Sequence, residues 1–109
     1  MLKKEYAADQ LSCLVTFELP AAVQAVSAHL CGEFNNWDQN SHPMTVNEDE
    51  SFTLTLQLDT GRSYRFRYLL DDSRWENDWA ADRYEPNGFG CDDSIVDLTV
   101  TSDSSTTEQ

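Results

Sequence analysis

The feature that most constrains the fold is a regular alternation of apolar and polar residues. In residues 52–58, FTLTLQL, every second side chain is apolar, which is the two-residue period of a strand with one buried face. The alternation resumes in residues 64–70, YRFRYLL, after the turn-forming sequence DTGR. We therefore predict two strands, residues 52–58 and 64–70, paired as an antiparallel hairpin.

Further short strands are predicted at both ends of the chain. Residues 14–19 alternate up to Pro20, which cannot donate to a strand ladder, and residues 26–31 and 94–100 have a similar apolar character. Residues 21–25 are predicted to be a loop, because Pro20 and the shortness of the segment argue against a helix. Short strands, each with one apolar face, predict an all-β, immunoglobulin-like antiparallel sandwich of two packed sheets.

The alternation also predicts which side chains of residues 64–70 point outward. If the aromatic residues and Leu70 line the core, Arg65 and Arg67 lie on an exposed face, and they are two of only seven basic residues. These arginines either pair with surface carboxylates, which contributes little for each pair, or serve a binding site.

Size and charge limit the function classes. A chain of 109 residues holds one domain with one core, which we place at residues 11–100 between an extension at 1–10 and a disordered polar tail at 101–109. The formal charge of -13 repels phosphates and anionic lipids, so neither nucleic acid nor a membrane is an expected partner. The start of the sequence lacks the apolar segment of a secretory signal, and the expected location is cytoplasmic.

The cysteines and histidines do not form a recognisable metal or redox motif. Cys13, Cys31 and Cys91 are widely spaced and include no Cys-x-x-Cys pair, while His29 and His42 stand alone. We expect reduced, mostly buried thiols, and neither a metal nor a cofactor.

The acidic cluster after residue 70 invites a comparison with glycosidases. Asp71, Asp72, Glu76 and Asp78 could supply the two carboxyl groups of such an enzyme. That chemistry needs a deep cleft that removes one carboxyl from water, and a small sandwich offers only loops and a sheet face. We therefore expect a protein that is not an enzyme, with carboxylates in solvated turns.

Two segments place tryptophan among amides and charged groups: GEFNNWD at 32–38 and RWENDW at 74–79. A pyranose has C–H groups on its faces and hydroxyls around its rim, so a binding protein needs flat rings surrounded by polar groups. Trp37, Asn36 and Trp75 are candidates for such a surface. Alternatively, Trp37 covers one end of the sandwich and Trp75 packs beneath the loop at 78–87. In that loop Trp79, Tyr84 and Phe89 could form a small core of their own, which is our interpretation of Tyr84.

Six pieces of the chain, in order and spacing, resemble the isoamylase-type early-set domain of carbohydrate-binding module family 48. That module is also similar to the glycogen-binding domain of AMP-activated protein kinase β subunits. The pieces are GEFNNW (32–37), PM (43–44), FRYLLDD (66–72), RWEND (74–78), DRYEPNGFG (82–90) and SIV (94–96). No single piece is specific, but their combination covers most of the chain.

The resemblance implies a set of sugar contacts. In the glycogen-binding relatives, two tryptophans at the positions of Trp37 and Trp75 stack on glucose rings, and a basic residue matches Arg67. A loop before the last strand supplies an apolar residue and an amide, at the positions of Phe89 and Asp93. Here the sequence departs from the pattern of the family it resembles, because Asp93 replaces an expected asparagine and Cys91 stands near a position usually filled by a hydroxyl.

Two function classes follow from this resemblance. The first is a non-catalytic module that binds an α-1,4-linked glucan such as glycogen, starch or a maltooligosaccharide, and that could direct an unlinked protein of glycogen metabolism to it. The second is an immunoglobulin-like protein–protein interaction module that has lost sugar binding. The two differ in whether Trp37, Arg67 and Trp75 lie together on one exposed face.

Overall fold

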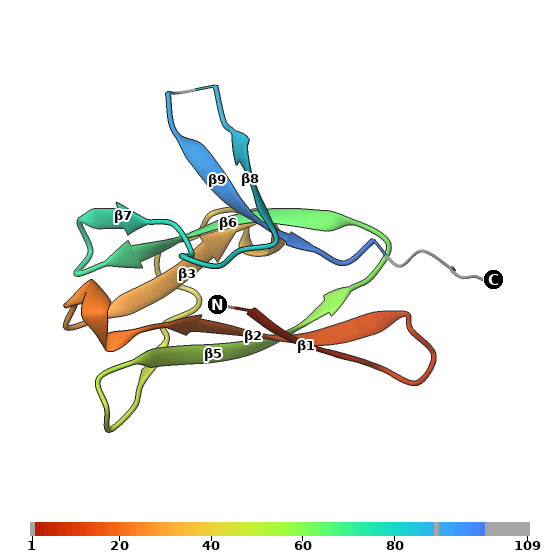
Figure 1. The fold of residues 1–109 in the computed structure, drawn as a ribbon, viewed down its shortest axis with the longest axis horizontal. Coiled ribbons are helices and arrows are strands. Elements are labelled where there is room, and N and C mark those ends of the chain that lie inside the picture. Colours follow the sequence, from red (N-terminus) through yellow and green to blue (C-terminus); the bar gives the residue numbers. More distant parts are fainter. Residues whose placement is uncertain (1, 89, 100–109) are drawn as a thin grey trace.

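A computed structural model describes residues 2–88 and 90–99 as a sandwich of two antiparallel sheets (Figure 1). One sheet has the strand order β1-β2-β5-β4, and the other has the order β3-β6-β9-β8 with β7 also paired to β6. The strands are β1 (Leu2–Tyr6), β2 (Ser12–Leu19), β3 (Ala28–Gly32), β4 (Thr45–Val46), β5 (Phe52–Asp59), β6 (Ser63–Leu70), β7 (Arg74–Glu76), β8 (Arg83–Pro86) and β9 (Asp92–Asp97). The predicted all-β, immunoglobulin-like sandwich is confirmed; Phe89 and the predicted tail lie outside the described residues.

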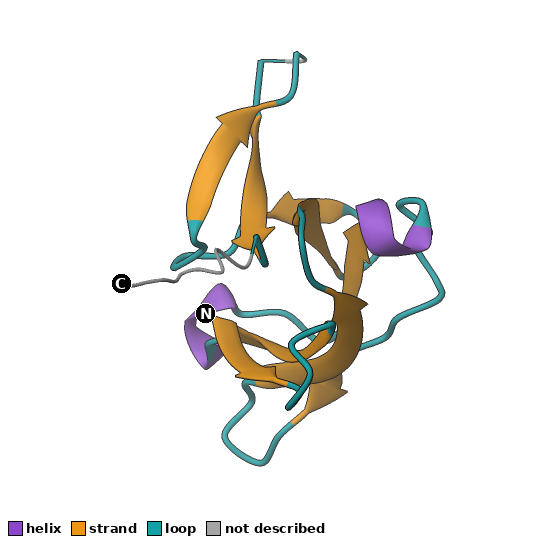
Figure 2. Ribbon diagram, turned by 90° about the vertical axis from the view of Figure 1, so that its right-hand side faces the viewer, coloured by secondary structure: helices purple, strands orange, loops and turns teal. Residues whose placement is uncertain are grey.

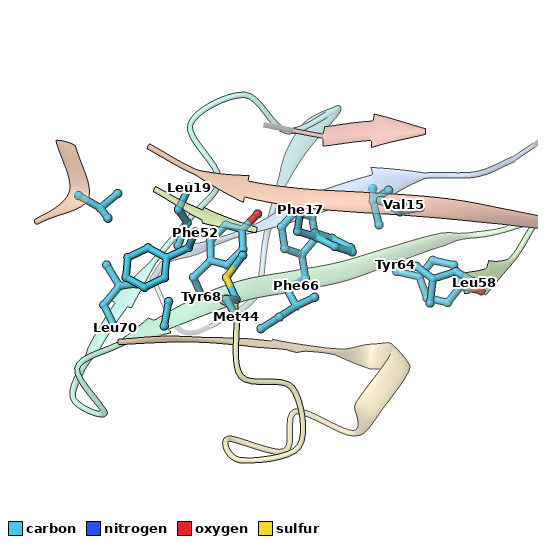
Figure 3. Close-up of a cluster of buried hydrophobic side chains, with 14 of the residues drawn as sticks. Val15, Phe17, Leu19, Met44, Phe52, Leu58, Tyr64, Phe66, Tyr68 and Leu70 are labelled. Carbon is cyan, nitrogen blue, oxygen red and sulfur yellow. The ribbon is translucent and has the colours of Figure 1, made fainter. Parts of the chain in front are cut away.

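The core lies between the two sheets and is rich in aromatic rings. Phe66 packs edge-on against Phe17 and Tyr68, with ring centroids 5.0 and 5.6 Å apart. Because β2 belongs to one sheet and β6 to the other, these rings join the two layers (Figure 3). The labelled core side chains in Figure 3 are Val15, Phe17, Leu19, Met44, Phe52, Leu58, Tyr64, Phe66, Tyr68 and Leu70.

The predicted hairpin between residues 52–58 and 64–70 is wrong, although both strands exist. β5 pairs with β2 and β6 pairs with β3, so the two strands belong to different sheets. The turn between β5 and β6 forms backbone hydrogen bonds with Leu98, which follows β9. Gly61 N–H donates to the Leu98 carbonyl at 2.8 Å, and Leu98 N–H donates to the Arg62 carbonyl at 3.0 Å. β5 and β6 each present one apolar face to the same core. The alternation of apolar and polar residues therefore arises from packing these two faces together, and it does not require the two strands to pair.

Two further segments differ from the sequence expectation. Residues 21–25, predicted as a loop, contain a 3-10 helix at Ala21–Val23 whose Val23 is buried. A second 3-10 helix, at Glu33–Asn35, follows β3, and both form single turns outside the sheets (Figure 2). Residues 1–10 were expected to be an extension, but Leu2–Tyr6 pairs with β2 as an edge strand.

The outer face of the β6 sheet carries the residues of interest. Along β6 the aromatic side chains point into the core, and Arg65 and Arg67 point away from it, as predicted. Register places Cys31 of β3 beside Arg67, and Trp75 of β7 beside Leu69. Since partners across an antiparallel ladder project to the same side, this outer face brings β3, β6 and β7 side chains together.

No helix in residues 2–88 and 90–99 is long and apolar enough to cross a membrane. In the same part of the chain no group of three or more His, Cys, Asp or Glu side chains is arranged to hold a metal ion. The three cysteines are free thiols, with Cys13 and Cys31 buried as expected and Cys91 exposed.

Candidate functional site: a groove between two tryptophans

A groove with a volume of about 460 Å³ crosses the outer face of the β6 sheet. This volume falls within the range of small-molecule binding pockets, roughly 300 to 1,000 Å³. The groove is lined by Trp37, Gln39, Arg65, Arg67, Trp75, Pro86, Asn87 and Asp93. Trp37, Arg67 and Trp75, the three residues whose grouping separates the two function classes, therefore lie together on one face.

Arg67 lies at the centre of this groove and contacts both indole rings. Its guanidinium carbon is 4.9 Å from the ring centroid of Trp75 and 5.9 Å from that of Trp37, both within cation–π range. Trp37 is half-buried and Trp75 is 38% exposed, so the groove holds two accessible apolar faces. Arg67 Nε is buried and has no hydrogen-bond partner among the described residues, so the two Nη groups of this 23% exposed side chain are the donors that a ligand can reach.

Asp93 is the anionic centre beneath the arginines. Its carboxylate accepts from Arg65 Nη1 at 3.2 Å and from Asn87 Nδ2 at 3.2 Å. Arg67 Nε lies 3.3 Å from Asp93 Oδ1, which is ion-pair distance without hydrogen-bond alignment. The residue is only 4% exposed, and a buried carboxylate of this kind is stable only when it is paired.

The two arginines predicted to face outward have different surroundings. Arg65 donates to Asp93, to Glu85 Oε1 at 3.1 Å and to the Pro86 carbonyl at 3.4 Å, so its donors are occupied. Arg67 is at ion-pair distance from Asp93 and also contacts both tryptophan rings. Both arginines therefore pair with a carboxylate, and Arg67 in addition lines the space between the rings.

Trp37 is positioned by the tight turn that follows β3. Asn35 closes this turn: its Oδ1 accepts from Gly32 N–H at 3.0 Å, and its Nδ2 donates to the Leu30 carbonyl at 2.9 Å. Trp37 N–H donates to the Gly32 carbonyl at 2.8 Å. Asn36 and Trp37 both have left-handed backbones, with φ of 56° and 59°, which is uncommon for a bulky residue. The turn imposes this conformation and directs the indole over the sheet.

Trp75 is positioned by strand pairing. It lies in the middle of β7, opposite Leu69 of β6, so its direction follows from the ladder. The turn before β7 contains Asp71, whose Oδ1 accepts from Val26 N–H at 2.7 Å and Ser27 N–H at 3.0 Å. These two backbone donors lower the pKa of the Asp71 carboxyl below its ordinary value, with the charge of Arg74 as a smaller cause.

The structure gathers most, but not all, of the residues suggested by the sequence. Trp37, Arg67, Trp75 and Asp93 line the groove, whereas Asn36 is exposed and is not among the lining residues. Phe89 lies outside the described residues. The Asp93 side chain faces the two arginines and Asn87, and the amide at this end of the groove belongs to Asn87.

Four lining residues were absent from the candidate set: Gln39, Arg65, Pro86 and Asn87. Arg65 carried a usable signal, because its outward direction follows from the same alternation as that of Arg67. Asn87 lies in a turn sequence, PNG, and nothing local indicates that its amide turns toward β6. Gln39 follows Trp37 by two residues, and its placement depends on the left-handed turn described above.

The acidic residues that suggested a glycosidase have other roles. Asp71 bonds two backbone amides, and Glu76 Oε2 accepts from Trp79 Nε1 at 2.8 Å. Asp78 is buried and accepts from the Tyr68 hydroxyl at 2.6 Å, and burial raises the pKa of Tyr68 well above its ordinary value. None of these carboxylates lines the groove. The Tyr84 hydroxyl donates to the Asp78 carbonyl at 2.5 Å, but Tyr84 and Trp79 are 44% and 54% exposed, so they do not form the small core that the sequence suggested for this loop.

Comparison with protein families matches residues 15–85 to carbohydrate-binding module 48, the isoamylase N-terminal domain. The match covers more than half of the 109 residues and includes both groove tryptophans and Arg67. Asn87 and Asp93 lie beyond its end. Comparison with curated proteins gives no significant match.

Proposed function

Because the chain belongs to the carbohydrate-binding module 48 family, we propose that its groove binds linear α-1,4-linked glucan of the glycogen or starch type. The observation that carries the proposal is the convergence of two indole rings on one arginine, with Arg67 4.9 Å from the Trp75 centroid and 5.9 Å from that of Trp37. Membership in the family gives a carbohydrate-binding module in general. The glucan and the stacking residues are our inference from this geometry.

The chemistry of the groove suits a neutral hydroxylated ring. The indole faces of Trp37 and Trp75 can cover the C–H faces of glucose units, and the Nη groups of Arg67 can donate to hydroxyl oxygens between them. Gln39 and Asn87 add amides at the rim. The charges of the groove are paired locally, with Arg65 held by Asp93 and Glu85, so no charged ligand is required.

We propose binding without chemistry. The carboxylates near the groove do not flank an open space in the way that a glycosidase pair does, since Asp93 is buried against two arginines. A module of this kind would act in the cytoplasm by bringing an unlinked protein of glycogen metabolism to its polymer.

A titration with maltoheptaose tests the proposal. One or two stacked rings and a few hydrogen bonds make a weak site, so we expect a Kd in the micromolar to millimolar range, about -8 to -4 kcal/mol. Trp37→Ala should abolish binding in the groove, seen as loss of the Trp75 response, while lowering the free energy of unfolding by about 1 kcal/mol, because the ring is only half-buried. Tyr6→Ala is the matched control, since it removes an exposed ring from the other sheet and should bind like the wild type.

Two results would count against sugar binding. If the wild type gives no change in tryptophan fluorescence or amide shifts with maltoheptaose, the groove is not a glucan site. If Trp37→Ala unfolds the domain, the ring is a structural plug for the end of the sandwich. In either case the protein–protein interaction module becomes the better interpretation.

A further inference from the structure

A second pocket, with a volume of about 380 Å³, lies on the other side of β7. Trp75 and Glu76 are consecutive strand residues, so their side chains project to opposite sides, and Trp79 is bonded to Glu76 rather than to the groove. The pocket is lined by Glu18, Leu19, Pro20, Ser51, Thr53, Trp79 and Ala80. It shares no lining residue with the groove described above.

Trp79 is an exposed ring with a fixed direction. Its side chain is 54% exposed, yet Nε1 donates to Glu76 Oε2 at 2.8 Å. The backbone beside it is anchored on the buried Asp78: Asp78 N–H donates to Ser94 Oγ at 2.9 Å, and Ala80 N–H donates to Asp78 Oδ1 at 2.7 Å. A ring held in this way loses little conformational freedom on binding, which favours a preorganised platform.

The rest of the pocket provides a small apolar floor with hydroxyls beside it. Leu19, Pro20 and Ala80 give apolar contact next to the indole, and Ser51 and Thr53 supply hydroxyl groups. Asn47 Nδ2 donates to Ser51 Oγ at 3.0 Å and to Thr53 Oγ1 at 3.5 Å. Within the described part of the chain, the Thr53 hydroxyl proton has no acceptor and is free to donate to a ligand.

This combination of an aromatic face and hydroxyls fits a pyranose better than the other ligand classes. Glu18 at the rim and the net charge of -13 disfavour phosphates and carboxylates. A stable protein interface takes roughly 20 to 30 residues from each partner, far more than the seven that line this pocket. One neutral sugar ring is therefore the occupant that the pocket accommodates.

We propose that the pocket around Trp79 is a second carbohydrate site that receives a glucose unit of a separate segment of the same polymer. The choice of sugar rests on the proposed function of the groove. The two weak sites lie on different sides of β7. Once one site holds a branch of the polymer, binding of another branch at the second site is intramolecular. The second site therefore increases affinity for glycogen and leaves the affinity of the groove for a short oligosaccharide unchanged.

The indole N–H resonances of Trp37, Trp75 and Trp79 report on each site separately. Maltoheptaose should shift the Trp79 resonance in the Trp37→Ala variant, in which the groove is disabled. Trp79→Ala should keep the groove response to maltoheptaose, yet bind glycogen at least about tenfold more weakly than the wild type. Tyr6→Ala should match the wild type in both measurements. The first readout does not depend on how well the Trp79 variant folds.

The possible failures are distinguishable. If Trp37 and Trp75 respond to maltoheptaose and Trp79 does not, the second site is wrong and the proposed function stands. If only Trp79 responds, the groove proposal is wrong and the second site stands. If the Trp79 resonance shifts with protein concentration in the absence of glucan, the pocket is a self-association surface and the second site is overturned.

Discussion

Trp37 and Trp75 face the same groove, but the chain holds them there in different ways. Trp37 depends on a turn closed by one side chain, Asn35, and on two consecutive left-handed residues. Trp75 sits in the ladder between β6 and β7, where the backbone fixes the direction of the side chain. One ring is placed by side-chain bonds and the other by strand pairing.

The difference teaches where the groove is sensitive to mutation. A strand residue keeps its direction as long as the ladder persists, because alternation is a property of the extended backbone. A turn residue keeps its direction only while the bonds that impose its conformation are present. Single substitutions should therefore damage the Trp37 side of the groove more than the Trp75 side, and the following variants test this in order of expected effect.

Gly32→Ala should have the largest effect. A Cβ atom at Gly32 would lie 2.6 Å from the Arg65 carbonyl oxygen and 2.9 Å from Phe66 Cβ, and neither the carbonyl nor a Cβ atom can move without shifting the backbone of β6. Overpacking of this kind costs up to about 3 kcal/mol, so the melting temperature should fall by roughly 10 °C or more. Thermal unfolding followed by circular dichroism measures this.

Gly88→Ala provides the comparison for that measurement. Gly88 has a φ of 84° and open space around its Cβ position. Alanine at this position therefore causes no steric overlap and costs only about 1 kcal/mol for the left-handed backbone conformation. If Gly32→Ala is no more destabilising than Gly88→Ala, the close approach of β3 to β6 does not constrain the turn that carries Trp37.

Asn35→Ala should have the next largest effect, and Asp71→Ala is its counterpart on the Trp75 side. Losing the Asn35 amide leaves the Leu30 carbonyl and Gly32 N–H without their partner, at a cost of about 1 to 3 kcal/mol. If the free energy of binding maltoheptaose weakens by the same amount, the Kd rises roughly tenfold or more. Asp71→Ala also removes two backbone bonds, but β7 pairing remains and the Kd should change little.

Asn40→Ala serves as a control in the same loop, because the residue is exposed and, among the described residues, bonds only through its backbone N–H, which donates to Asp38 Oδ1. Equal losses of affinity in Asn35→Ala and Asp71→Ala, measured by the same titration, would remove the distinction between the two sides.

The sequence predicted the parts of the fold that follow from local periodicity. The alternation in residues 64–70 placed Tyr64, Phe66 and Tyr68 in the core and the two arginines outside it. It could not assign strand partners, because β5 and β6 each have one apolar face and the pattern is the same whether they pair or pack. The sheet assignment depends on contacts between distant segments, which no local pattern encodes.

The groove was predictable in outline and not in detail. The family resemblance indicated Trp37, Arg67 and Trp75, and the structure places all three side by side. The buried position of Asp93 beneath two arginines depends on the register of β9 against β6. The separate surroundings of Trp79 depend on the bond to Glu76. Both facts arise from tertiary packing and leave no signal in residue spacing.

Lowering the pH should weaken the turn before β7, which Asp71 anchors. Backbone donors lower the pKa of Asp71 in the folded chain, so this carboxylate stabilises the fold above its ordinary pKa of 3.8 and loses that effect as the pH falls through the lowered value. Asp71→Asn should be less stable than the wild type at pH 7 and approach it under acid conditions. Melting temperatures across the acid range give the result, and a constant difference would show that the Asp71 charge is not involved.

Salt should have the smallest effect, and it tests whether the two rings or the arginines dominate binding. Arg65 is neutralised by Asp93 and Glu85, and Arg67 lies 3.3 Å from Asp93, so the groove has little net positive field. Stacking of a neutral sugar on Trp37 and Trp75 does not release counterions. The Kd for maltoheptaose should therefore change by less than about twofold between low salt and 0.5 M salt, where the Debye screening length is roughly 4 Å.

A cationic protein partner attracted by the charge of -13 would instead be released by salt. A steep salt dependence of maltoheptaose binding would mean that charged side chains, rather than the two rings, supply the affinity, and the different ways in which the rings are held would then have no consequence for binding.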